Sequence, residues 1–255
     1  MSESMYEAIF KRKSIRNYDP TPIDSNRLEE ISRNLQSLKP MLADIKTDFK
    51  VISPNQVSRK INNNAPHFIA AFSEAKGAYE VNIGFMLQQM DLYFSASSLG
   101  SCWLGIPRPT KEVIESSNLE FIVLMSFGNS KEALYRTSAS EFHRKSLSDI
   151  TDVKDADDLL EPAHLAPSAV NLQNWYFTGD KNVIHAYSSK AGFLRSRLGG
   201  GYFPINMGIA LYHLKLAAEH YGMKNKFIFD SSKDKSPPKN LEYVATLEIE
   251  QTSQE

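Results

Sequence analysis

The chain lacks most features that would assign it to a special class of protein. A single cysteine, Cys102, among 255 residues allows no internal disulfide and no cysteine cluster for zinc. Its 29 Lys and Arg balance 30 Asp and Glu, so general binding of nucleic acid is disfavoured. No run approaches the ~20 apolar residues of a membrane span, and the acidic first residues do not fit a signal peptide. We therefore expect a cytoplasmic protein with no metal, membrane or nucleic-acid partner.

Enough apolar residues are present for a packed core, since 42% are hydrophobic and 23% are charged. Residues 82–99 carry apolar side chains on nearly every side, which predicts a central buried helix ending at Gly100. Spacing and turn residues predict further helices near 5–13, 25–35, 159–165 and 204–222, and strands near 49–52, 68–72, 121–127, 175–177 and 243–249.

The second half of the chain repeats the plan of the first. Asn-Leu-Glu-Phe at 118–121 introduces one buried strand, and Asn-Leu-Glu-Tyr at 240–243 introduces another, 122 residues later. The same offset places the helix at 82–99 on the apolar segment 204–222, and Gly100 on Gly222. We therefore predict an α+β fold of two related modules, residues 1–148 and 149–255, that together form one globular unit.

Positive charge is concentrated at residues 11–16, beside the first predicted helix. Four cations and a hydroxyl occur within six residues of an otherwise neutral chain. Arg12, Ser14 and Arg16 alternate, so on extended backbone they project to one side, where guanidinium groups and a hydroxyl could hold a phosphate. The alternative is a solvated basic helix end favoured by the helix dipole, and composition alone favours that alternative.

The loop 166–175, Ala-Pro-Ser-Ala-Val-Asn-Leu-Gln-Asn-Trp, is a second candidate site. Small residues and Pro167 allow the backbone to approach a flat ligand, and Asn171 and Gln173 supply donors and acceptors. A plain helix-to-strand connection explains the proline and serine but not two amides beside a tryptophan.

Residues 99–107 follow the long predicted helix. We expect a capping glycine that leads into hydrophobic packing, with Cys102 as a small core residue. Apolar neighbours would raise the pKa of this thiol, and no histidine lies near it in sequence, so Cys102 is not predicted to be catalytic.

Together these segments resemble the nitroreductase family of FMN-dependent oxidoreductases, most closely its branch called putative TM nitroreductases. Residues 12–16 match the Arg-Arg-Ser-x-Arg phosphate motif. Residues 166–175 match the loop Ala-Pro-Ser-x-x-Asn-x-Gln-Pro-Trp, with Asn174 in place of proline. Residues 99–105 match the Gly-Leu-Gly-x-x-Trp-x-Gly stretch, with Ser98 in place of its first glycine.

The order of these motifs departs from the family. Family members carry the phosphate motif and the Pro-Ser loop in one module and form homodimers, with each FMN between the motif of one subunit and the loop of the other. Here the first module has only the motif and the second only the loop, and residues 38–45 show no Pro-Ser-x-x-Asn. The resemblance therefore implies a monomeric, intramolecular pseudo-dimer with one FMN site, and leaves further association open.

The resemblance also implies the residues of the site. Arg12, Lys13, Ser14 and Arg16 would hold the phosphate. The backbone N–H of Leu104 or Gly105 would face flavin N5, and the residues of the loop 166–175 would pack on the ring or contact the ribityl chain. Arg144 and Lys145 are equally well explained as further flavin-binding cations and as a basic linker. The candidate cofactor-binding residues are Arg12, Lys13, Ser14, Arg16, Leu104, Gly105, Arg144, Lys145, Pro167, Ser168, Asn171 and Gln173.

The implied activity is that of an FMN-dependent NAD(P)H oxidoreductase. Hydride would pass from NADH or NADPH to the flavin and then, by ping-pong kinetics, to a small electrophilic acceptor such as a nitroaromatic, a quinone or a flavin. No catalytic side chain is required, and residues 199–203 would form an aromatic rim to the substrate site or only a flexible loop. Two alternatives stay open: a non-catalytic flavin-binding or redox-sensing protein, and a phosphate-ligand-binding module without flavin.

Overall fold

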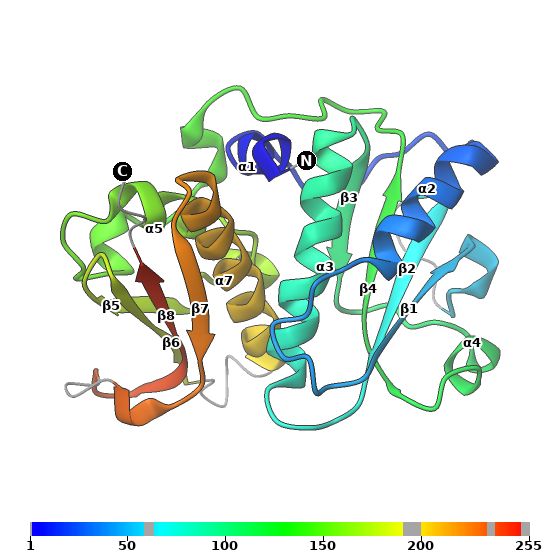
Figure 1. The fold of residues 1–255 in the computed structure, drawn as a ribbon. Coiled ribbons are helices and arrows are strands. Elements are labelled where there is room, and N and C mark those ends of the chain that lie inside the picture. Colours follow the sequence, from blue (N-terminus) through cyan, green and yellow to red (C-terminus); the bar gives the residue numbers. More distant parts are fainter. Residues whose placement is uncertain (1, 59–63, 191–199, 234–237, 251–255) are drawn as a thin grey trace.

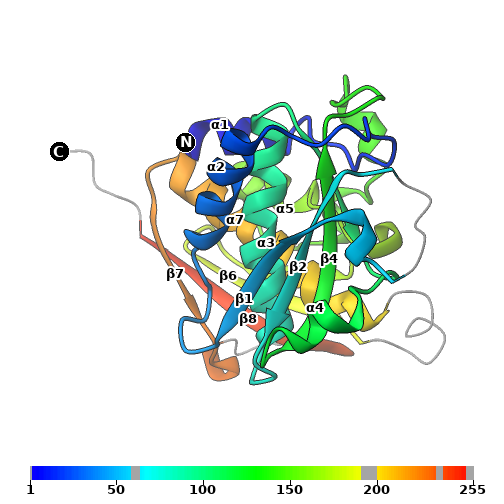
Figure 2. The same cartoon turned by 90° about the vertical axis from the view of Figure 1, so that its right-hand side faces the viewer.

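The computed structural model describes residues 2–58, 64–190, 200–233 and 238–250. The described chain forms two α+β modules, each with a four-stranded antiparallel sheet (Figure 1). One 18-residue helix from each module lies between the two sheets, and these two helices pack on each other (Figures 1 and 2). The predicted α+β fold of two related modules is confirmed.

The first module holds its sheet in the order β1-β2-β4-β3, so β3 is an edge strand. Asp24 caps the second helix, because its side chain accepts a hydrogen bond from Arg27 N at 3.0 Å. The elements are α1 (Ser2–Ile9), α2 (Ser25–Gln36), β1 (Thr47–Ile52), β2 (His67–Ser73), α3 (Tyr79–Ala96), β3 (Gly100–Leu104), α4 (Lys111–Glu115) and β4 (Glu120–Gly128).

The second module repeats this order as β5-β6-β8-β7. Even the irregularities correspond, since β2 and β4 shift register next to Phe121, and β6 and β8 shift next to Tyr243, 122 residues later. The elements are α5 (Asp157–His164), β5 (Trp175–Gly179), β6 (Val183–Ser189), α7 (Phe203–His220), β7 (Lys224–Ile228) and β8 (Leu241–Glu250).

The central helices α3 and α7 cross at a glycine of each. A Cβ on Gly84 would overlap the carbonyl oxygen of Ile205, and a Cβ on Gly208 would overlap that of Val81. The two glycines are 124 residues apart, and so are the two residues that they meet. The first residues of α3 and α7 are also 124 residues apart. Such a reciprocal contact is what a twofold relation between two modules produces.

The end of α3 differs from the sequence prediction. The left-handed residue that follows α3 is Ser98, with φ 59°, whereas Gly100 is the first residue of β3. After α7 the left-handed residue is Gly222, with φ 69°, as predicted. Ser98 and Gly222 are therefore the equivalent residues. An offset of 124 relates the helices, and the predicted 122 holds only for β4 and β8.

Two other predicted segments are corrected. The first helix ends at Ile9, so residues 11–13 lie beyond it, and Arg12 forms an isolated β-bridge with Tyr135. Gly100 does not cap a helix but begins β3, in which each of residues 100–104 pairs with β4. Strands β3 and β7 have five residues each, which leaves only a short pattern to be read from sequence, and the seven-residue β6 was not predicted either.

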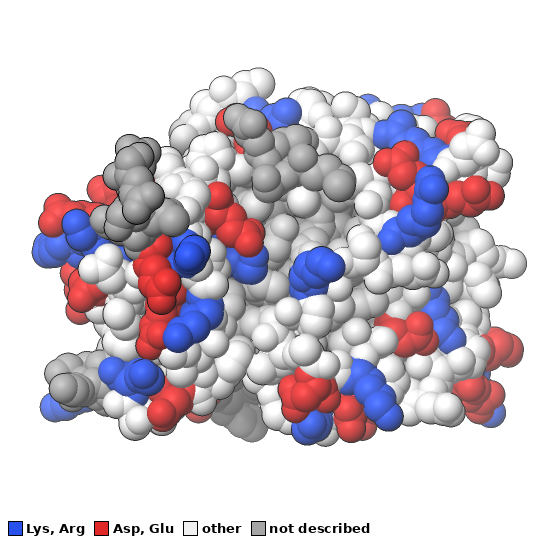
Figure 3. Space-filling model, in the orientation of Figure 1, with Lys and Arg blue, Asp and Glu red and all other residues white. Residues whose placement is uncertain are grey.

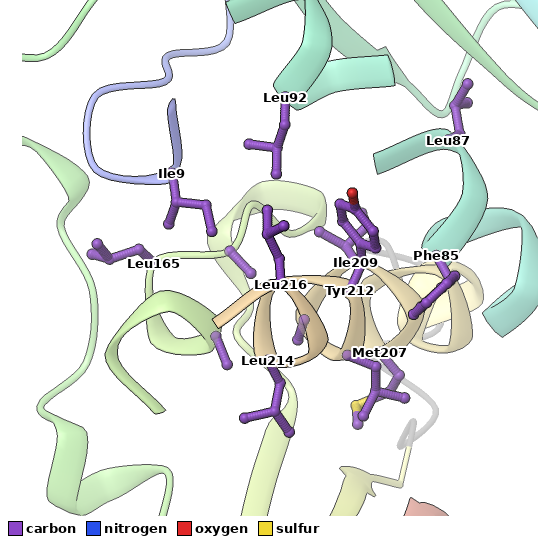
Figure 4. Packing of buried hydrophobic residues seen from close by; sticks show 14 of the residues in the cluster. Ile9, Phe85, Leu87, Leu92, Leu165, Met207, Ile209, Tyr212, Leu214 and Leu216 are labelled. Atoms are coloured by element: carbon purple, nitrogen blue, oxygen red, sulfur yellow. The ribbon is translucent and has the colours of Figure 1, made fainter. Parts of the chain in front are cut away.

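The main hydrophobic core belongs to both modules. Figure 4 shows Ile9 of α1, Leu92 of α3 and Leu216 of α7 pointing into one region between the helices. All three side chains are fully or almost fully buried. Burial of this kind stabilises each module only in the presence of the other, because neither central helix has a polar face to turn toward water.

On the face drawn in Figure 3, Lys and Arg side chains are interspersed with Asp and Glu over both modules. Within the described ranges, no helix has the length and apolar character needed to cross a membrane.

Candidate functional site

The phosphate-motif segment runs beside the edge strand β3. Ser14 forms a parallel bridge with Ser101, and Ile15 N donates to Ser101 O at 2.9 Å. The Arg12 side chain turns inward and is only 1% exposed, with Nη2 donating to Ser14 Oγ at 3.0 Å. Arg12 and Ser14 therefore lie on the same side of the segment, as their alternation predicts.

Arg12 has a buried partner that sequence reasoning missed. Its Nε lies 2.9 Å from Asp91 Oδ2 of α3, as an ion pair without the alignment of a good hydrogen bond. Asp91 is fully buried. A lone carboxylate inside the apolar segment 82–99 was the available signal, because a charged group is almost never buried without a partner.

Two further guanidinium groups lie close to Arg12. Arg136 Nη1 donates to Arg12 O, and the Arg136 and Arg144 guanidinium groups lie 4.2 and 5.6 Å from the ring centre of Phe142. Burial, followed by repulsion from Arg12, lowers the pKa of Arg136 to about 10 and that of Arg144 to about 9. We call Arg12, Arg136 and Arg144 the arginine cluster.

The arginine cluster carries more positive charge than its surroundings neutralise. Asp91 is the only buried carboxylate among the described residues. Glu141, which lies near Arg136, is fully exposed to water, so it screens weakly. The Nε of Arg144 is buried with no hydrogen-bond partner among the described residues. Partly buried cations that are incompletely compensated and have a spare donor favour the binding of an anion.

The loop of the second module reaches this cluster. Arg144 Nη1 donates to Asn171 Oδ1 at 2.6 Å, and Asn171 Nδ2 donates to His143 O at 2.8 Å. Lys145 N donates to Gln173 Oε1 at 2.8 Å. Residues 143–146 thus connect the arginine cluster of the first module to the two amides that the sequence singled out.

The backbone of this loop is strained. Val170, Asn171 and Gln173 have φ of 43°, 58° and 47°, in the left-handed region, which is least favourable for the β-branched Val170. The Val170 side chain is 75% exposed, so packing of this side chain does not explain the conformation. Hydrogen bonds hold the loop, since Ala169 N donates to Asn206 Oδ1 and Gln173 N donates to Ser168 Oγ, both at 3.0 Å. Pro167, just before, is buried.

The equivalent place in the first module lacks these groups. Asn82, 124 residues before Asn206, accepts two backbone N–H groups of segment 38–45 at 2.9 Å each, so this segment is the counterpart of the loop. The residue 124 positions after Asp91 is Lys215, which pairs with Glu219 of its own helix. The described counterpart site therefore has neither the Pro-Ser loop nor the buried carboxylate.

The end of β3 lies under an aromatic ring of the second module. Leu104 is half-buried and Gly105 is exposed. The hydroxyl of Tyr202 donates to Gly105 O, and a Cβ on Gly105 would lie 2.7 Å from the Tyr202 ring. A larger residue at position 105 would therefore displace the Tyr202 ring. Tyr202 belongs to the predicted aromatic rim, of which Gly199 lies outside the described residues.

The remaining candidates lie at the edge of the cluster. Lys13 Nζ lies 3.3 Å from Glu132 Oε2, and the backbone N of Arg16 donates to Glu132 Oε1 at 2.8 Å, with the Arg16 side chain exposed. Burial raises the pKa of Cys102, as predicted, although Arg16 and Arg12 beside it oppose that rise. The neighbours of the thiol are therefore not only apolar.

A family described as "Putative TM nitroreductase" matches residues 4–218. The chain belongs to this family. Among solved structures, a putative nitroreductase of Thermotoga maritima is 20% identical with a TM-score of 0.67, over 96% of this chain and 93% of that one. It therefore shares the fold of the described molecule.

Two other nitroreductase structures match less well. A nitroreductase family protein of Clostridium difficile is 20% identical with a TM-score of 0.46, over 57% of this chain and 94% of that one. A nitroreductase with bound FMN from Desulfitobacterium hafniense is 11% identical with a TM-score of 0.45, over 56% of this chain and 97% of that one. No curated protein matches the chain.

Proposed function

We propose that this chain is an FMN-dependent NAD(P)H oxidoreductase that passes electrons by ping-pong kinetics to a small electrophilic acceptor, such as a nitroaromatic, a quinone or a flavin. The observation that carries the proposal is the arginine cluster. It places uncompensated positive charge where the phosphate-motif segment of one module meets the Pro-Ser loop of the other, in a chain of the nitroreductase family.

The residues present fit a flavin phosphate. A phosphate monoester brings about two negative charges and three acceptor oxygens. The buried Nε of Arg144, which has no partner among the described residues, and the nearby guanidinium of Arg12 are suitable donors. Ser14 and the exposed Arg16 flank them on the same segment. We assign the phosphate to these four residues, with Lys13 contributing charge from the rim.

The other candidates have roles around the flavin ring. Bound FMN would supply the two-electron chemistry of its isoalloxazine. Pro167 and Ser168 would form a wall against the ring, with Asn171 and Gln173 contacting the ring edge or ribityl chain and Lys145 holding Gln173 in place.

The backbone N–H of Leu104 or Gly105 would donate to the reactive edge of the ring, and Tyr202 would limit access to it. None of these roles requires a side chain to take up or release a proton. The modules, residues 1–148 and 149–255, would each contribute one side of a single site.

Absorption spectroscopy and turnover test this proposal. Full-length protein, purified and then saturated with FMN, should show the visible band of oxidised flavin with about one FMN per chain. NADH or NADPH should bleach that band, and a quinone acceptor should restore it. Bound flavin that neither nucleotide reduces would indicate a flavin-binding or redox-sensing protein. Phosphate binding without flavin binding would indicate a module for another phosphate ligand, and two FMN per chain would contradict the single site.

A further inference from the structure

A chain of buried polar groups connects the second module to Arg12. It runs from Pro162 O of α5 through His213 of α7 to Gln88 and Asp91 of α3. His213, Gln88 and Asp91 have no exposed surface. Polar groups so deeply buried are costly unless each is satisfied, so the donors and acceptors must match along the whole chain.

Only one arrangement of hydrogens satisfies His213. Its Nδ1 lies 2.8 Å from Pro162 O, and because a carbonyl oxygen only accepts, Nδ1 carries the hydrogen. Burial lowers the pKa of His213 to about 3, so the ring is neutral and Nε2 is an acceptor. That acceptor lies 2.9 Å from Gln88 Nε2, which donates to it.

The Gln88 amide is fixed in the same way. Its second Nε2 hydrogen is donated to Asp91 Oδ2 at 3.0 Å, and its Oε1 accepts from Trp103 Nε1 at 3.3 Å. A flipped amide would set its oxygen against the Asp91 carboxylate and its NH₂ against the Trp103 N–H. The neutral His213 and the Trp103 indole therefore determine which way Gln88 faces.

Gln88 in turn restrains the carboxylate that pairs with Arg12. Asp91 Oδ1 accepts from Ser101 Oγ at 2.6 Å, while Oδ2 accepts from Gln88 and faces Arg12 Nε. With both oxygens engaged, the carboxylate cannot rotate. The Nε edge of Arg12 is thereby held against Asp91, while its Nη2 donates to Ser14 Oγ.

We propose that Gln88 and His213 are positioning residues for Arg12: they hold Asp91 in one orientation and, through it, fix the guanidinium that binds the flavin phosphate. This inference rests on the proposed function. Phosphate binding by the first module would then depend on a histidine of the second module, although neither Gln88 nor His213 would contact the ligand.

Helix α3, which carries Gln88, also carries a residue that serves as a matched control. Gln89 is buried as well, and its amide donates to Lys39 O at 2.7 Å and accepts from Lys39 N at 3.0 Å. It has no link to Asp91. Gln88→Leu and Gln89→Leu each remove a buried amide from α3, so a loss of stability alone would affect both variants alike.

Calorimetric titration of the full-length apo-protein with FMN, and separately with inorganic phosphate, tests the proposal. Gln88→Leu and His213→Leu should weaken binding of both probes about tenfold, the effect of one hydrogen bond to a charged group. Gln89→Leu should keep wild-type affinity. In an Asp91→Asn background, Gln88→Leu should add almost nothing, because its effect passes through the carboxylate. Gln88→Glu, which keeps the side-chain size, serves if the leucine variant does not fold and should weaken binding too.

The outcomes separate this inference from the proposed function. Wild-type affinity in the Gln88 variants, or an equal loss in Gln89→Leu, would overturn the positioning role while flavin binding stands. A wild-type protein that binds phosphate but not FMN would refute the proposed function, and the phosphate titrations would still decide the role of Gln88. Failure of the wild type to bind either probe would overturn both.

Discussion

Replacement of Asn171 separates two roles that the structure gives to one residue. Its backbone is left-handed, with φ 58°, and its side chain joins Arg144 to His143 O at 2.6 and 2.8 Å. Asn171→Ala removes the side chain and also places a less tolerant residue in that conformation. Asn171→Gly removes the same side chain without the conformational cost.

The two variants should differ in the stability of the apo-protein. The left-handed backbone costs alanine ~1 kcal/mol, and the lost hydrogen bonds cost ~1 kcal/mol because the side chain is exposed. At roughly 2–4 °C per kcal/mol for a protein of this size, Asn171→Ala should lower the melting temperature by about 4–8 °C and Asn171→Gly by about half as much.

Both variants should lose the same part of the stabilisation by FMN. At a hundredfold excess over its Kd, a ligand stabilises the folded state by about 2.7 kcal/mol, or roughly 5–10 °C here. If loss of the Asn171 side chain raises the Kd tenfold, the same FMN concentration gives only about half of that stabilisation. The assay is thermal unfolding of each variant with and without FMN. An FMN-induced rise that is the same in wild type and both variants would remove Asn171, and with it the loop, from the site.

Further outcomes follow from single side chains. Arg16→Ala should weaken FMN binding about tenfold in a flavin titration, at the low end for a charged hydrogen bond because the side chain is exposed; unchanged affinity would return Arg16 to a solvated surface. Cys102→Ala should leave NAD(P)H turnover largely intact, since burial raises the pKa of the thiol, and loss of flavin reduction with FMN still bound would instead indicate thiol chemistry. Gly208→Ala should destabilise the protein by ~1–3 kcal/mol in urea unfolding because a Cβ meets the backbone of α3, whereas Gly201→Ala, which meets nothing within 4 Å, should not. The unfolded chain protonates His213 near pH 6.5 and the folded chain only near pH 3, so stability should fall as pH drops through this window; replacing His213 should flatten that fall, and an unchanged pH profile would contradict the buried neutral ring.

The sequence by itself determined the class of fold and indicated the segments of the candidate site. The buried helices at α3 and α7 and the strands β2 and β4 follow from continuous apolar runs, which are local properties of the chain. The resemblance to the nitroreductase family, carried by the motifs at residues 12–16 and 166–175, also implied that these two segments belong to one ligand site. The positions of short strands and helix ends were harder to predict. The end of α3 was placed wrongly because Ser98 adopts the left-handed conformation that glycine usually takes there.

Tertiary structure alone decided which charges meet. Asp91 lies about 80 residues from Arg12 and Arg136 more than 120, and no local pattern encodes such contacts. The link from His213 to Asp91 through Gln88 depends on the crossing of α3 and α7, which the glycines permit by letting two backbones approach. Sequence reasoning identified candidate groups for binding an anion. Only the folded chain shows that their positive charge is partly buried, incompletely neutralised and contacted by residues of both modules.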